Sequence, residues 1–76
     1  MSLGNYLKNV RLDKKLSLRE ASELSGLSHT YISDVEKGIR RGSNKPVTPS
    51  PETLKKLSGA YNIDYYDLLR RAGIIE

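Results

Sequence analysis

The segment from Ser17 to Gly38 constrains the fold of this chain most, because it places two short helical patterns on either side of one turn. The turn is Ser25-Gly26-Leu27, and Gly26 can adopt the positive φ that ends a helix without a clash from a Cβ atom. Ser22 supplies a small side chain where the two helices would cross most closely. Two helices joined steeply by such a turn form the arrangement that places a helix in the major groove of DNA.

Apolar periodicity and capping signals predict five helices and no strand. The helices cover about residues 3–14, 17–24, 28–37, 51–62 and 65–72. Ser17 and Glu20 form a capping box at the start of the second helix, and Gly38 ends the third. Ser50 followed by Pro51 begins the fourth. The fold class is therefore predicted to be all-α.

The inward faces of these helices predict a thin apolar core. Its expected members share helical spacing: Leu3, Tyr6, Leu7, Val10, Leu18, Ala21, Ser22, Ile32, Val35, Leu54, Leu57, Tyr61, Leu68, Leu69 and either Tyr65 or Tyr66. Gly59 lies inside the fourth helix, where glycine costs about 1 kcal/mol relative to alanine, so we expect a close packing contact there. Ile74 and Ile75 either help to close this core or form part of a dimer interface.

Composition excludes several classes of function. The 76 residues suffice for one domain, which buries about 60 % of its unfolded surface. The absence of cysteine rules out disulfides and thiolate chemistry, and it fits a reducing, cytoplasmic interior. No apolar run approaches the roughly 20 residues that span a bilayer. No nucleophile–base pair, metal cluster or phosphate-binding glycine loop is present, so we expect no catalytic residue, metal or cofactor.

Basic residues gather just after the third predicted helix. The net charge of +4 is weak evidence for nucleic acid by itself, but its distribution is informative. Residues 39–50 form a predicted loop without acidic residues. Four cations lie in or beside it: Lys37, Arg40, Arg41 and Lys45. We expect them to contact DNA phosphates, which supplies affinity without sequence information; the alternative is a flexible charged surface loop.

Several short motifs resemble the Cro/C1 family of helix-turn-helix regulators, also called XRE-like. They are Ala21-Ser22-Glu23, Gly26-Leu27-Ser28, Ile32-Ser33, Glu36-Lys37-Gly38 and, further on, Asn62-Ile63-Asp64 with Leu68-Leu69. The resemblance spans nearly all of residues 1–76. It implies one compact, five-helix, lambda-repressor-like DNA-binding domain with its helix-turn-helix at the second and third helices. The family commonly has Leu-Ala where this chain has Ala21-Ser22, a departure that keeps small side chains at the crossing.

The resemblance also implies roles for individual residues. The third helix would enter the major groove, with base contacts expected from Ser28, His29, Thr30, Ser33 and Asp34. Further phosphate contacts are expected from Ser17, Arg19 and Tyr31. Arg11 and Glu36 match a pair that the family uses as a buried ion pair between its first and third helices. Leu18 replaces a polar residue often seen there, so that backbone contact is either absent or supplied by Ser17 or Arg19.

The chemistry of the outer face suits base reading. His29 can donate to a purine N7 or guanine O6, and the Thr30 methyl can meet a thymine methyl. Asp34 can accept from cytosine N4 while repelling phosphate, which sharpens selectivity. The alternative is that these are ordinary solvated residues. For Tyr31 two interpretations stay open: a half-buried ring with its hydroxyl toward a phosphate, or a plain core tyrosine.

These inferences predict a prokaryotic or phage transcriptional regulator, a repressor, that binds an operator in double-stranded DNA and has no enzymatic activity. A homodimer is expected, formed in solution or only on the DNA, with no membrane association. The rival hypothesis is a protein-interaction module on the same scaffold, such as an antitoxin or a coactivator-like adaptor. It should tolerate changes at His29 and Thr30 but fail when Ile74 and Ile75 are altered.

Overall fold

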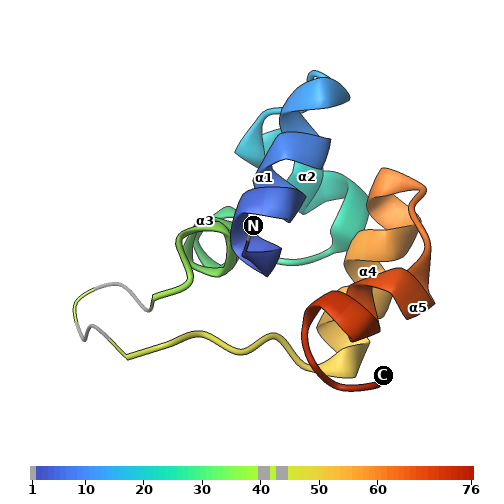
Figure 1. The fold of residues 1–76 in the computed structure, drawn as a ribbon. Coiled ribbons are helices and arrows are strands. Elements are labelled where there is room, and N and C mark those ends of the chain that lie inside the picture. The colour runs from blue at the N-terminus through green and yellow to red at the C-terminus, as the bar shows by residue number, and fades with distance from the viewer. Residues whose placement is uncertain (1, 40–41, 43–44) are drawn as a thin grey trace.

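The computed structural model describes residues 2–39, 42 and 45–76. Arg40 and Arg41, two predicted phosphate contacts, lie outside the described residues. Within these residues the chain forms five helices, α1 (Leu3–Asp13), α2 (Leu18–Ser25), α3 (His29–Lys37), α4 (Pro51–Tyr61) and α5 (Tyr65–Arg71) (Figure 1). The all-α prediction is confirmed. No helix in the described part of the chain has the length and apolarity needed to cross a membrane.

Local capping sets the helix boundaries. Each helix begins after a residue whose side-chain oxygen accepts from the backbone N–H three positions on, and these N-caps are Ser2, Ser17, Ser28, Ser50 and Asp64. Ser17 and Glu20 form the predicted capping box. Gly26, Gly38 and Asn62 end α2, α3 and α4 in the left-handed conformation, with φ of 78°, 79° and 55°. These short-range signals explain why the predicted boundaries agree with the structure to within about one residue.

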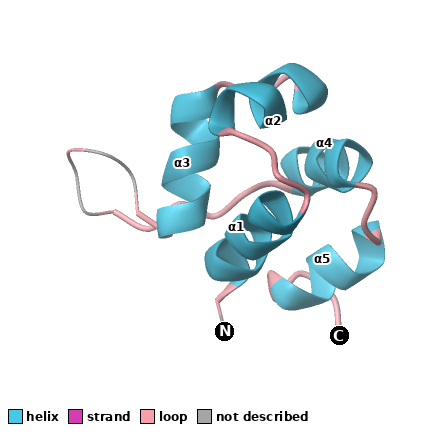
Figure 2. Cartoon of the chain, turned by 90° about the horizontal axis from the view of Figure 1, so that it is seen from above, coloured by secondary structure: helices cyan, strands magenta, loops and turns pink. Residues whose placement is uncertain are grey.

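The core lies where α1, α2 and α4 meet the inner faces of α3 and α5. α2 packs against both α3 and α4, α1 packs against α3, and α4 packs against α5 (Figure 2). The buried apolar residues are Leu7, Ala21, Ile32, Val35, Leu54, Leu57, Tyr61, Leu68 and Leu69. Several of the predicted core members are only half-buried: Leu3, Tyr6, Val10, Leu18 and Ser22. Tyr65 is half-buried whereas Tyr66 is 61 % exposed, which decides between the two tyrosines.

Gly4, and not Gly59, makes the close helix contact. A Cβ atom added at Gly4 would lie 2.4 Å from the Glu36 carbonyl oxygen and 2.6 Å from that of Val35. The first turn of α1 therefore rests directly on the backbone at the end of α3. At Gly59 an added Cβ would meet no atom within 4 Å, so the expected packing contact there was wrong.

The C-terminal apolar residues divide between two environments. Leu68 and Leu69 join the core, but Ile74 and Ile75 remain 41 % and 38 % exposed. Arg71 anchors α5 to α1, because its guanidinium lies 3.7 Å from the centre of the Tyr6 ring. α3 and α5 lie at opposite ends of the molecule in both views (Figures 1 and 2). The exposed isoleucines are thus separate from the outer face of α3.

We expect Gly4→Ala to lower the free energy of unfolding by about 1–3 kcal/mol, because the new methyl group must displace backbone atoms at the α1–α3 contact. The matched control is Gly59→Ala, which should raise the same free energy by about 0.5–1 kcal/mol, since alanine favours the helix and meets no neighbour. Urea denaturation of the two variants measures both effects. Equal effects of the two substitutions would contradict the contact.

Candidate nucleic-acid interface

α3 is two-sided, and its polar side is uncovered. Ile32, Val35 and Glu36 turn inward and are buried. Along the other side, His29, Thr30 and Lys37 are exposed, whereas Ser33 and Asp34 are half-buried; Ser28, the N-cap, is exposed as well. The Ser28 Oγ accepts from the Tyr31 N–H at 3.1 Å, which leaves the hydroxyl hydrogen available to an outside acceptor. The predicted base-contacting residues therefore lie together on one accessible face.

Two serines hold the turn between α2 and α3. The Ser22 hydroxyl donates to the Leu27 carbonyl oxygen at 2.5 Å, and the Leu27 N–H donates to the Ser25 Oγ at 3.1 Å. With Gly26 in the left-handed conformation, these bonds set the angle between the two helices. Serine at position 22 thus bonds across the turn besides being small.

The start of α2 lies beside the start of α3. Ser17, Leu18, Arg19 and His29 line a common surface hollow of about 570 Å³. The Ser17 Oγ accepts from the Glu20 N–H, and the Glu20 carboxylate accepts from the Ser17 N–H, both at 3.0 Å. These bonds hold the pKa of Glu20 below its usual value, so a negative charge stands near this end of the face.

The other end of α3 is joined to the returning loop. The Val47 N–H donates to the Gly38 carbonyl oxygen at 3.2 Å, and Ile39 forms an isolated antiparallel bridge with Pro46. This bridge brings Lys45, which is exposed, back to the helix end that carries Lys37. Two of the four predicted loop cations therefore belong to this end of α3.

The environment of Tyr31 combines features of the two interpretations that the sequence left open. Its ring is half-buried, and its hydroxyl lies 3.4 Å from the Thr53 Oγ1 in the first turn of α4. Thr53 also accepts from the Ser50 hydroxyl at 3.1 Å. The hydroxyl therefore helps to join α3 to α4, and its contact with a phosphate stays a prediction.

A buried ion pair connects α1 with α3. The Arg11 Nε donates to Glu36 Oε2 at 2.7 Å and its Nη2 to Oε1 at 3.0 Å, while Nη1 donates to the Leu16 carbonyl oxygen at 2.8 Å. The two side chains are 8 % and 6 % exposed. The hydrogen bonds to Glu36 raise the pKa of Arg11, although burial opposes this. The pair that the resemblance implies is thus present, and it neutralises the carboxylate.

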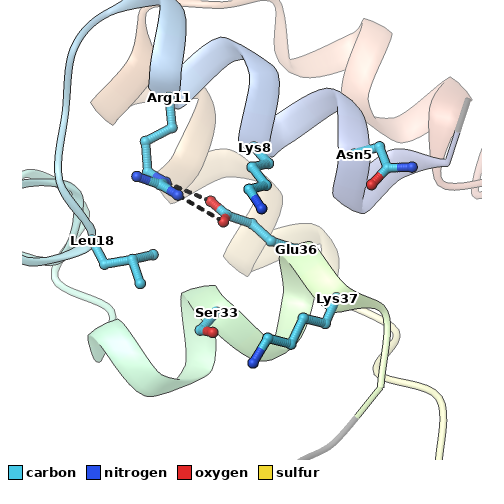
Figure 3. A pocket seen from close by; sticks show the side chains of 7 residues that line it. All are labelled: Asn5, Lys8, Arg11, Leu18, Ser33, Glu36 and Lys37. Atoms are coloured by element: carbon cyan, nitrogen blue, oxygen red, sulfur yellow. Dashed lines mark hydrogen bonds and ion pairs between the residues drawn. The ribbon is translucent and has the colours of Figure 1, made fainter.

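A second surface hollow opens between α1 and α3 beside this ion pair (Figure 3). It measures about 420 Å³ and is lined by Asn5, Lys8, Arg11, Leu18, Ser33, Glu36 and Lys37. Sequence reasoning did not single out Asn5 and Lys8. Their spacing to Arg11, at i, i+3 and i+6 along α1, is the signal that places all three on one side of that helix.

Tyr61 is a buried polar residue beneath the ion pair. It is 1 % exposed, and its hydroxyl has no hydrogen-bond partner among the described residues. Burial raises the pKa of Tyr61 to about 12, with Glu36 adding to the rise and Arg11 opposing it. The phenol therefore remains protonated in the folded domain well above the pH at which a free tyrosine ionises.

Comparison with known proteins agrees with this geometry. The helix-turn-helix family model matches residues 7–68, which include α2, α3 and most of the remaining helices. The chain belongs to the Cro/C1-type helix-turn-helix family. The helix-turn-helix domain thus has its two motif helices at α2 and α3, joined by the turn at Gly26.

Curated relatives of this helix-turn-helix domain include proteins that are named as transcriptional regulators. The HTH-type transcriptional repressor RghR of Bacillus subtilis (strain 168) is 39 % identical over 75 residues, 99 % of this chain and 51 % of the repressor. The uncharacterised regulator RghRB of that strain is 36 % identical over 96 % of this chain and 48 % of its own. The ImmF control region 10 kDa protein of Bacillus phage phi105 is 34 % identical over 82 % and 61 %. The chain spans about half the length of the first two.

We expect Arg11→Met to lower the free energy of unfolding by about 3–5 kcal/mol, because Glu36 is left buried without a partner. The double variant Arg11→Met/Glu36→Leu should recover most of this loss, since no uncompensated charge remains. Urea denaturation followed by circular dichroism measures both. A double variant that is no more stable than the single one would contradict this account.

We expect the domain to lose about 2–3 kcal/mol of stability between pH 10 and pH 12 through Tyr61. The unfolded chain releases this proton near pH 10, whereas the folded domain holds it to about pH 12, so the contribution is complete below pH 10 and falls as the pH rises. Tyr61→Phe should remove this part of the pH dependence while changing stability at pH 7 by less than about 1 kcal/mol. Identical alkaline profiles for the two proteins would contradict the prediction.

Proposed function

We propose that this domain binds double-stranded DNA with sequence specificity, with α3 in the major groove. The observation that carries the proposal is the uncovered polar side of α3, with cations at both of its ends. Arg19 stands near the N-terminal end, and Lys37 and Lys45 stand at the C-terminal end. None of these three has an ion-pair partner among the described residues, so their charges remain available to phosphates.

In this proposal the face of α3 reads base edges. His29 and Thr30, at the exposed N-terminal end, reach furthest into the groove, and Ser28, Ser33 and Asp34 add polar contacts. The start of a helix also presents unpaired N–H groups that favour acceptors on DNA. Asp34 selects against bases that offer it no donor, because its carboxylate accepts from the cytosine amino group. The same carboxylate repels phosphate.

The surrounding residues position the domain on the backbone. Phosphate contacts are proposed for Ser17, Arg19, Tyr31, Lys37, Arg40, Arg41 and Lys45. Such contacts provide affinity that falls steeply with salt, with a slope of about −0.9 for each neutralised phosphate. They set the register in which the base-reading face meets the groove.

We further propose that the domain acts within a transcriptional repressor of a bacterium or phage, in the cytoplasm, as a homodimer. Ile74 and Ile75 together with Tyr66 leave apolar surface exposed at the C-terminal end, which suits pairing with a second copy. A two-fold operator with half-sites about 34 Å apart would follow. Repression requires only that the operator be occupied, so we assign no catalytic residue, metal or cofactor.

The test is selection of bound duplexes from a randomised pool, followed by affinity measurements on the recovered operator. We expect a palindromic sequence, and we expect His29→Ala/Thr30→Ala to lower affinity for it by about 10-fold to 100-fold while leaving binding to random duplex unchanged. Recovery of arbitrary sequence would contradict specific recognition.

The matched control is Ile74→Ser/Ile75→Ser. In the proposed function it reduces pairing of two domains on the palindrome but leaves binding to a single half-site intact. The rival function, a protein-interaction module, predicts the reverse pattern: no operator is recovered, and loss of function follows the isoleucine changes and not the change at His29 and Thr30.

A further inference from the structure

The hollow between α1 and α3 combines two free cations with a neutralised carboxylate. Lys8 of α1 and Lys37 of α3 both line it and are exposed. Neither lysine has an ion-pair partner among the described residues, unlike Arg11, Lys56, Arg70 and Arg71. Glu36 is the acidic residue of the lining, and Arg11 holds both of its carboxylate oxygens. The lining therefore carries a net charge of +2.

The polar and cationic side chains that line this hollow come from two helices, α1 and α3. Asn5 and Lys8 follow one another along α1 at helical spacing, and Ser33 and Lys37 do so along α3. Figure 3 shows Lys8 extending from α1 toward α3, while Lys37 runs back along α3 toward Ser33. The Gly4 contact fixes the separation of the helices just beyond the hollow. Two cations and two neutral polar side chains from separate helices thus surround one opening.

The position of the hollow points to its ligand. Ser33 and Lys37 belong both to its lining and to the proposed DNA-facing side of α3. Leu18 lines this hollow and also the one beside His29, so the two hollows adjoin along the same face. A helix that lies in the major groove has a phosphate backbone on each side, and a cationic hollow beside it meets one of them.

We propose that this hollow binds one phosphate group of the DNA backbone, held between Lys8 of α1 and Lys37 of α3, with Asn5 and Ser33 as neutral hydrogen-bonding partners. The proposal rests on the proposed function and extends it to α1, in which no DNA contact was predicted. Lys8 is a positioning residue: it provides affinity and register without reading sequence. Because α1 is fixed to α3 by the Arg11–Glu36 pair, this contact orients α3 in the groove.

The first experiment compares Lys8→Gln with the wild type over a series of salt concentrations, on the selected operator and on a random duplex. For each bound domain we expect the salt slope to become less steep by about 0.9 on both duplexes, which corresponds to about eightfold weaker binding per domain at 0.1 M salt. The ratio of the two affinities should not change, because a phosphate contact carries no base information.

The matched control is Lys55→Gln, which removes one exposed charge from α4, outside the lining of the hollow. It should leave the slope at the wild-type value. Thermal unfolding midpoints of the two variants should agree, since neither lysine is buried. A Lys8→Gln slope equal to that of Lys55→Gln overturns the proposal.

The second experiment locates the phosphate. Operators carrying a single neutral methylphosphonate linkage are scanned along both strands. We expect one linkage in each half-site at which the neutral substitution lowers the affinity of the wild type and of Lys55→Gln. It should not lower the affinity of Lys8→Gln any further, since that variant already lacks the contact. Additive losses at every linkage would show that Lys8 acts only through the general field, and this would overturn the proposed contact.

The two proposals fail in different ways. A wild-type domain that binds operator and random duplex equally contradicts sequence-specific function, but the slopes of Lys8→Gln and Lys55→Gln on random duplex still decide whether Lys8 contacts phosphate. If the wild-type domain binds its operator specifically but Lys8→Gln leaves the salt slope unchanged, the proposed function stands and the proposed α1 contact is overturned.

Discussion

The arrangement of this domain depends on how α1 is held against the inner side of α3. A charged pair at this joint is almost fully removed from water, so each partner needs the other, and the glycine below it brings two backbones into contact. These two features fix where α3 stands relative to the rest of the chain. They also decide the electrostatics of the surface, because the carboxylate that would otherwise repel DNA is matched by a guanidinium within the fold.

Much of the fold could be predicted from the sequence because its helix boundaries are local. Serine or aspartate N-caps, one capping box and glycine or asparagine at helix ends act over three or four residues, and each is visible in the sequence. Gly4 and Gly59 show where this reasoning ends. Both are glycines inside helices, and only the docking of α1 on α3, between residues more than 30 positions apart, distinguishes the close contact from the open position. Helical periodicity likewise left Tyr65 and Tyr66 as alternatives, since both lie near the boundary of the inner face.

The candidate site likewise has a part that one helix alone predicts and a part that depends on contacts between helices. The outer face of α3 follows from a period of 3.6 residues within one helix, so its members could be identified in advance. Lys8 was not singled out, because its place beside the hollow depends on how α1 docks against α3, and the periodicity of one helix does not show which residues of another helix line the same opening. The Tyr31 hydroxyl shows the same limit, since its partner Thr53 belongs to another helix beyond the loop.

The two-sidedness of α3 has a consequence for how such domains diversify. Ile32 and Val35 hold the helix to the body and contribute nothing to its outer surface, whereas His29 and Thr30 are exposed and contribute little to the core. Mutations on the outer side can therefore accumulate with little loss of stability. A gene duplicate could acquire a new target while its scaffold stays unaltered, so that recognition and folding evolve as nearly independent traits.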